Sequence, residues 1–181
     1  MTFAVPTPEL ISRFGVTGLN FFPRYDHLPP LHEKTAVFLS AVGLPHNDRF
    51  MSRTEADPIN LSDRFSEEDG VLPKECGTWL EIGWFQNMII ALDPADGKVY
   101  AFPEGSLLED YEELNRDVES LVYTVMAFED FSIACEGAVD LDLLESRFKD
   151  QINRFDPIPF GDEDSQWSRI TDDLLEASWT A

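Results

Sequence analysis

The chain has 181 residues, of which 35 are Asp or Glu and 13 are Lys or Arg, so its formal net charge is -22. This charge repels phosphate backbones and anionic lipid surfaces, which argues against nucleic acids and membranes as partners and favours a basic protein. Because 43% of the residues are hydrophobic and 12% are aromatic, we still expect a folded chain, with residues 1–181 forming a single domain.

The N-terminal part predicts two short helices separated by an irregular segment. The sequence PELISRF at 8–14 is typical of a short helix, whereas the stretch at 18–34 is too rich in proline and aromatics for a long one. The sequence TAVFLSAV at 35–42 predicts the second helix, with Thr35 as its N-cap and Gly43 in the left-handed conformation that closes it.

The middle of the chain carries the strand signal. Residues 47–75 are polar and predict an exposed loop with room for one short strand. The sequence TWLEIGWF at 78–85 then alternates as a strand does, which predicts that Leu80, Ile82 and Trp84 share one face and that Trp79, Glu81 and Phe85 share the other.

A β-hairpin follows directly. The runs NMIIALD at 87–93 and KVYAF at 98–102 flank the turn sequence PADG, in which Gly97 supplies a positive φ and Asp bonds its own backbone. Together with the strand before it, this hairpin predicts a three-stranded antiparallel meander.

The last third of the chain predicts three helices. Apolar residues recur at three and four positions over 115–128, with Asn115 or Asp117 as the cap, and a regular apolar stripe runs over 141–155. A final helix is expected near 165–178. The fold class we expect is therefore α+β, with an antiparallel sheet that has a central hairpin and is packed by several helices.

Two histidine pairs are the candidate metal ligands. His27 with Asp26, and His32 with Glu33, are residue types that bind zinc. They lie in a proline-broken loop and lack the spacing that aims two imidazoles of one helix at one ion. We therefore expect no metal, and a small metal-dependent hydrolase is a minor alternative.

Other reaction motifs are missing or incomplete. Residues 93–104 start with Asp93 and end with Glu104, as a calcium-binding EF-hand loop would, but Gly97 and Lys98 occupy the fifth and sixth positions, where that loop needs an oxygen ligand and its glycine. The sequence has no glycine-rich phosphate loop and no GxSxG nucleophile elbow. We expect neither enzymatic activity nor a cofactor.

The cysteines and the N-terminal sequence predict a cytoplasmic protein. Cys76 and Cys135 have no metal-site spacing and form no disulfide framework, so we expect reduced thiols. The sequence MTFAVPTPEL has neither a basic start nor an apolar signal core, and no apolar run approaches the roughly 20 residues that span a bilayer.

Candidate contacts for a protein partner are two aromatic anchors and eight acidic residues. Three large rings within seven residues of one strand do not all fit one core easily, so exposure of some of them would give a partner anchors to bind. The alternative for the rings is packing in the core. The alternative for the acidic residues is that they only keep the protein soluble. The ten residues are Trp79, Phe85, Glu67, Glu68, Asp69, Glu75, Glu81, Asp110, Glu112 and Glu113.

The succession of motifs along the chain resembles a known family. The motifs are RFGVTGLNFFP (13–23), TAVFLSAVGLP (35–45), WLEIGWFQNMIIALDPADGKVYAF (79–102), NRDVESLVYTVMAF (115–128), ESRFKDQINRFDP (145–157) and WSRITDDLLEA (167–177). In this order they are similar to the fourth group of the SUKH superfamily, the Smi/Knr-like proteins. One departure is the sequence at 114–117, Leu-Asn-Arg-Asp, where a short Asn-Ser or Asn-Asp motif is expected.

The resemblance implies an α+β fold with helices around one antiparallel sheet, and an immunity role. Members of the superfamily bind a cognate toxin domain, often a nuclease or a deaminase, and the resemblance supplies no catalytic residue and no contact residue. The hypothesis is an immunity protein whose acidic surface neutralises a basic toxin. The alternative from another class is a scaffold or regulatory module of the same fold that binds an endogenous protein.

Overall fold

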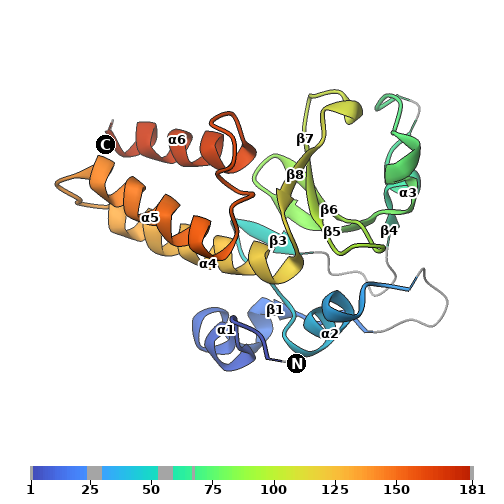
Figure 1. Ribbon diagram of the computed structural model, residues 1–181, viewed down its shortest axis with the longest axis horizontal. Coiled ribbons are helices and arrows are strands. Elements are labelled where there is room, and N and C mark those ends of the chain that lie inside the picture. Colours follow the sequence, from blue (N-terminus) through green and yellow to red (C-terminus); the bar gives the residue numbers. More distant parts are fainter. Residues whose placement is uncertain (1, 24–29, 53–58, 67, 180–181) are drawn as a thin grey trace.

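The computed structural model describes residues 2–23, 30–52, 59–66 and 68–179. Helices pack against antiparallel strands in an α+β fold, as predicted (Figure 1). The described elements are α1 (Thr7–Phe14), η1 (Val16–Gly18), β1 (Leu19–Asn20), α2 (Glu33–Ala41), β2 (Leu44–Pro45), β3 (Phe50–Ser52), β4 (Ile59–Asn60), α3 (Leu61–Arg64), η2 (Lys74–Thr78), β5 (Leu80–Phe85), β6 (Met88–Leu92), β7 (Val99–Pro103), η3 (Leu108–Asp110), β8 (Glu112–Asn115), α4 (Val118–Cys135), α5 (Leu141–Phe155) and α6 (Gln166–Trp179).

The central sheet has the strand order β3-β5-β6-β7-β8, and β4 pairs with another part of β5. The predicted hairpin is confirmed as β6 and β7, whose pairing runs from Leu92 opposite Val99 to the far ends of both strands. Gly97 has a φ of 83°, and Asp93 and Asp96 accept hydrogen bonds from backbone N–H groups of the turn. The three-stranded meander is thus part of a larger sheet, because β3, β4 and β8 add to it.

A β-bulge in β5 makes the predicted strand phase wrong. Glu81 pairs with Ala91 but Gly83 pairs with Ile90, so Ile82 is the extra residue and the alternation shifts by one position after it. As a result Trp84 and Phe85 exchange faces relative to the simple alternation. Phe85 points to the main core, and Trp84 packs against the smaller core on the other side.

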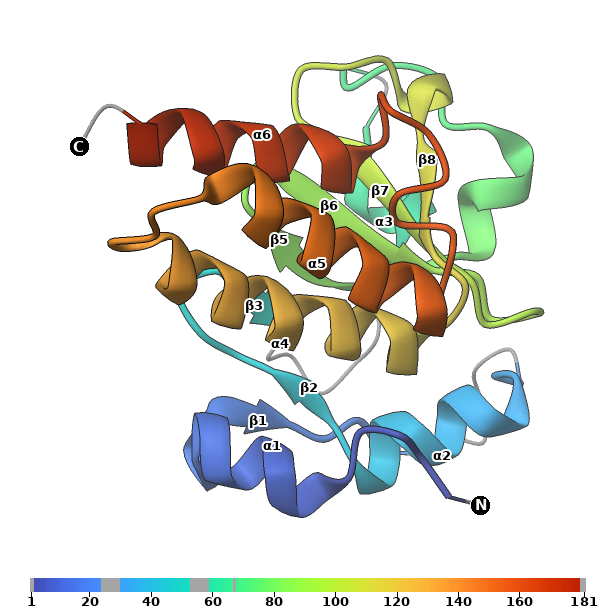
Figure 2. The same cartoon turned by 60° about the vertical axis from the view of Figure 1, so that its left-hand side comes forward.

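One face of the sheet is covered by α4, α5 and α6, which lie side by side (Figure 2). The main core lies in this layer, where the Trp167 ring centroid is 5.0 Å from that of Phe85 and 5.8 Å from that of Phe128. Helices α1 and α2 pack against the outer side of α4 (Figure 2). Because α4 has neighbours on several sides, apolar residues cover most of its circumference.

The opposite face of the sheet carries a second, smaller core under α3, η2 and η3. Leu61, Trp79 and Phe102 belong to it. The region 47–75 therefore differs from the predicted loop, because its described part contains β3, β4, α3 and the start of η2. This polar segment packs against the sheet because the side chain of Leu61 is buried in the smaller core.

The start of α2 differs from the prediction, whereas α4 begins at one of its two predicted caps, Asp117. Helix α2 begins at Glu33, and Thr35 is a buried residue beneath the β6–β7 turn instead of a cap. A Cβ at Gly97 would lie 2.5 Å from Thr35 Oγ1, so this contact requires glycine. Helix α4 begins after Asp117, whose side chain accepts a hydrogen bond from Ser120 N, while Asn115 ends β8.

Candidate functional site

The end of α5 is fixed by a buried carboxylate. Asp156 follows the last residue of α5 and is 0% exposed. Its side chain accepts hydrogen bonds from Ser120 Oγ and from the backbone N–H groups of Arg116 and Ile158, the latter two at 3.0 Å. These bonds tie the loop after α5 to the start of α4.

Asn115 extends this network to the sheet and to α6. Its Nδ2 atom donates to Ser120 Oγ at 3.0 Å and to Thr124 Oγ1 at 3.2 Å, and its Oδ1 atom accepts from Trp167 Nε1 at 3.2 Å. We call Asn115, Ser120, Thr124, Asp156 and Trp167 the polar network. Because all five side chains are buried and bonded, the network holds β8, α4, the α5–α6 loop and α6 in one arrangement.

A hollow of about 570 Å³ lies beside the polar network, between β8 and the α5–α6 loop. We call it the acidic groove, and it is lined by Glu112, Glu113, Pro157, Ile158, Gly161, Asp162, Asp164, Ser165 and Arg169. The position of these residues follows from the network, since Pro157 and Ile158 come directly after Asp156 and β8 ends at Asn115.

Two of the four carboxylates in the acidic groove are paired with cations. Arg169 Nη1 lies 3.2 Å from Glu112 Oε1, and Lys98 Nζ donates to Glu113 Oε2 at 2.9 Å, which raises the pKa of Lys98. Asp162 and Asp164 have no cation within ion-pair distance in the described part of the chain. The groove therefore keeps an excess of negative charge beside apolar side chains.

The acidic residues predicted as partner contacts do not lie together. Glu112 and Glu113 line the acidic groove, whereas Glu68, Asp69, Glu75 and Asp110 are exposed near the smaller core. Asp69 accepts hydrogen bonds from Ser66 N and Ser66 Oγ at 2.8 Å, and these bonds lower its pKa. Glu67 lies outside the described residues.

The structure corrects the two predicted anchors. Trp79 is 5% exposed and its ring stacks on Tyr100 with a centroid distance of 4.1 Å, and Phe85 is 0% exposed. The bulge turns Phe85 toward α4 and α6, and Trp79 faces the smaller core, so the two rings fill two cores on opposite faces of the sheet. Neither offers a surface to a partner.

Glu81 is also buried, at 7% exposed, so its prediction as a contact is corrected too. Its Oε1 atom accepts from Trp84 Nε1 at 3.0 Å. Its Oε2 atom lies 3.3 Å from Arg64 Nε without a well-aligned hydrogen bond. These contacts give Glu81 a structural role beside the smaller core, because burial of a carboxylate requires polar partners.

The described residues contain no group of three or more His, Cys, Asp and Glu side chains that could hold a metal ion. His32 is exposed at the start of α2, and His27 and Asp26 lie outside the described residues. Cys76 is buried, and burial raises the pKa of its thiol to about 11, which disfavours the reactive thiolate. Within the described chain, no helix has the length and apolar character needed to cross a bilayer.

The part of the acidic groove that comes from the α5–α6 loop was not predicted from the sequence. Asp162 and Asp164 belong to the acidic run at 162–164, which is the sequence signal that could have identified them. Its proximity to Glu112 depends on contacts between residues about fifty positions apart, such as the 3.0 Å hydrogen bond from Gln166 Nε2 to Glu112 Oε1.

Comparison with known proteins agrees with the resemblance that the motif order indicates. The family model described as SUKH-4 immunity protein matches residues 9–173. No curated protein and no solved structure matches the chain. Since the family model covers most of the sequence, the chain belongs to the SUKH-4 immunity protein family.

Proposed function

We propose that this immunity protein acts by binding a cognate toxin protein, and that the acidic groove receives a basic part of that toxin. The supporting observation is the composition of the groove: a hollow of about 570 Å³ with apolar residues and four carboxylates, two of which have no cationic partner among the described residues. Lysine or arginine side chains of a partner would complete this set of charges.

The proposed toxin class is an enzyme that acts on nucleic acid, such as a nuclease or a deaminase. Such enzymes bind phosphate backbones with basic residues, and an acidic surface can occupy the same residues. The net charge of -22 supports fast association with a basic protein, because complementary fields raise the association rate.

We also propose that neutralisation is stoichiometric and not catalytic, and that residues 1–181 act as one domain in the cytoplasm. The packing of α2 on α4 supports the single-domain part of this proposal. A binding protein that blocks a toxin by occupancy inhibits it in proportion to the amount added, whereas a catalyst inactivates many toxin molecules per copy.

The experiment uses the toxin domain encoded beside the gene for this protein. Its activity is titrated with increasing amounts of the purified protein, and the two are tested for a complex by gel filtration. The proposal expects a sharp end point at a fixed molar ratio and a co-eluting complex. No complex with that toxin, together with capture of a housekeeping protein from cells that lack any toxin gene, would instead support the endogenous scaffold.

A further inference from the structure

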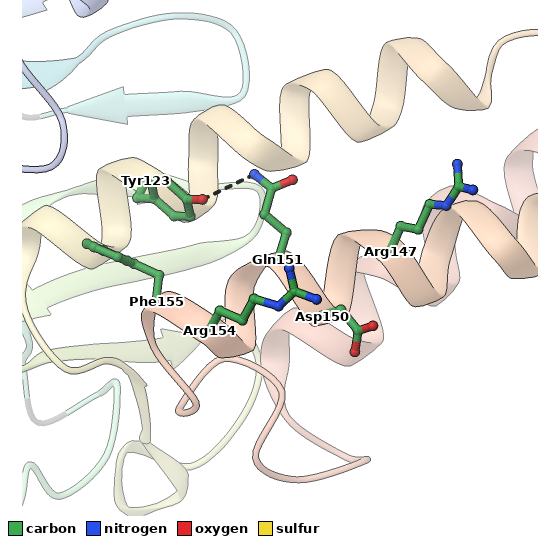
Figure 3. Close-up of a pocket in the computed structure, with 6 residues that line it drawn as sticks. All are labelled: Tyr123, Arg147, Asp150, Gln151, Arg154 and Phe155. Carbon is green, nitrogen blue, oxygen red and sulfur yellow. Dashed lines mark hydrogen bonds between the residues drawn. The ribbon is translucent and has the colours of Figure 1, made fainter.

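The outer side of α5 carries a second hollow of different chemical character (Figure 3). It has a volume of about 530 Å³ and lies between α4 and α5. We call it the arginine pocket, and its lining residues are Tyr123, Arg147, Asp150, Gln151, Arg154 and Phe155.

Its two arginines differ from most of the basic residues that the structure describes. Seven described basic residues lie within 4.0 Å of a carboxylate, namely Arg13, Lys34, Arg64, Lys98, Arg116, Lys149 and Arg169. Arg147 and Arg154 form no ion pair with any described residue, although Asp150 lines the same pocket. In a chain with 35 acidic and 13 basic residues, it is unexpected that both arginines of one pocket lack an ion pair with every described residue.

Two aromatic rings line the arginine pocket, and their positions are fixed by contacts with each other and with neighbouring side chains. The ring centroids of Tyr123 and Phe155 are 4.4 Å apart, and Gln151 Nε2 donates to the Tyr123 hydroxyl at 3.3 Å (Figure 3). Arg116 lies over the other ring, with its Cζ atom 4.7 Å from the Phe155 centroid. Arginine and tyrosine are enriched at the centres of protein interfaces, so this composition suits a binding hot spot.

We propose that the arginine pocket binds an acidic side chain of the toxin, in addition to the basic contact proposed for the acidic groove. A guanidinium group presents a planar set of donors that matches a carboxylate, and a partner carboxylate would form the ion pair that neither arginine makes with a described residue. The inference rests on the proposed function, because it assigns a second contact to the same partner.

The two sites flank the same end of α5. The arginine pocket ends at Phe155, and the acidic groove begins at Pro157, with the buried Asp156 between them. A partner that covers both must present a basic and an acidic group at a fixed separation. This requirement favours one orientation of the bound toxin. It also disfavours the binding of basic proteins that lack the acidic group, such as unrelated nucleic-acid-binding proteins.

The test measures binding of the toxin domain encoded beside the gene by calorimetry, and the dissociation rate by surface plasmon resonance. For each of Arg147→Ala and Arg154→Ala, we expect Kd to rise about tenfold or more, mainly through faster dissociation. Arg154→Lys keeps the charge but loses the planar donors, so it should have an intermediate effect. The matched control is Lys74→Ala, which removes one exposed cation on η2, on the other face of the sheet, and should change Kd by less than about twofold.

Charge reversal identifies the partner group. Arg154→Glu is combined with single Asp→Arg or Glu→Arg changes in the toxin, and recovery of binding by one pair would support the inference. Wild-type binding with unchanged Kd in both arginine variants would overturn the inference and leave the proposed function intact. Absence of binding by the wild-type protein would overturn both. Binding of a single-stranded oligonucleotide that depends on the two arginines would also overturn it, in favour of a phosphate site.

Discussion

The polar network and the rim of the acidic groove are adjacent, but the network buries its polar groups whereas the rim exposes two of its carboxylates. The rim is formed by the four carboxylates of the groove, those of Glu112, Glu113, Asp162 and Asp164. In the network, each of the five side chains is buried, and Asp156 alone accepts three hydrogen bonds. On the rim, Asp162 and Asp164 are exposed and have no cationic partner among the described residues. The network fixes the shape of this region, whereas the rim leaves charge available for a partner.

The difference means that residues important for stability lie next to residues proposed to bind the toxin. Loss of a buried, bonded group leaves donors without acceptors, which is costly, while loss of an exposed charge changes stability little. Substitutions in the network should therefore change the free energy of unfolding, and substitutions on the rim should change toxin binding.

The largest expected effect is that of Asp156→Ala. It leaves Ser120 Oγ and two backbone N–H groups without their acceptor, so we expect the free energy of unfolding to fall by about 3 kcal/mol. Urea denaturation followed by tryptophan fluorescence measures this change. Asp150→Ala, on the exposed side of α5, is the control and should stay within about 0.5 kcal/mol of the wild type.

Next in size is the effect of neutralising the rim. The variant carries Glu112→Gln, Glu113→Gln, Asp162→Asn and Asp164→Asn. We expect Kd for the toxin to rise about tenfold to a hundredfold, because the charges that would pair with basic side chains are gone. Isothermal titration calorimetry at fixed ionic strength provides the value.

A matched control removes four exposed acids around α3 and η3, away from the groove. It carries Glu68→Gln, Glu104→Gln, Glu109→Gln and Asp110→Asn. It has the same net charge as the rim variant but should bind with less than about a threefold change in Kd. Equal weakening by both variants would mean that overall charge, and not the groove, controls affinity.

Trp167→Phe tests the network with a smaller change. A smaller aromatic ring remains in the core, but the donor to Asn115 Oδ1 is lost, so we expect the free energy of unfolding to fall by about 1 to 2 kcal/mol with toxin binding nearly unchanged. Thermal unfolding and calorimetry check the two parts of this expectation. A loss of binding without a loss of stability would contradict the structural role of Trp167.

The smallest effect is expected for Lys98→Met. Lys98 forms a surface ion pair with Glu113, and its side chain is 40% exposed, so we expect a stability change below about 1 kcal/mol. Because the variant also frees the Glu113 carboxylate, toxin binding should be equal or slightly stronger. Weaker binding would show that Lys98 itself contacts the toxin.

The sequence predicted the elements whose signals are local. Gly97 and the two Asp residues of the turn identify the β6–β7 hairpin, and the apolar stripe from 141 to 155 identifies α5. The bulge at Ile82 does not follow from a simple alternation, and its local signal is Gly83, because glycine inside a strand often marks a bulge. Strand β8 was missed because it is short, and Asn115 reads locally as a helix cap.

Only part of the acidic groove could be predicted from the sequence. Glu112 and Glu113 were identified from their charge, but their union with Asp162 and Asp164 depends on the long-range bonds of Asp156 and Trp167. Large apolar rings near acids suggested exposed anchors, and the packing of two separate cores explains why Trp79 and Phe85 are buried instead.

The most direct test of the acidic groove as the toxin-binding site is the ionic-strength dependence of the association rate constant, measured by stopped flow for the wild type, the rim variant and the matched control. The account predicts a steep fall with salt for the wild type and the control, and a clearly shallower fall for the rim variant. The same slope for all three proteins would contradict the account.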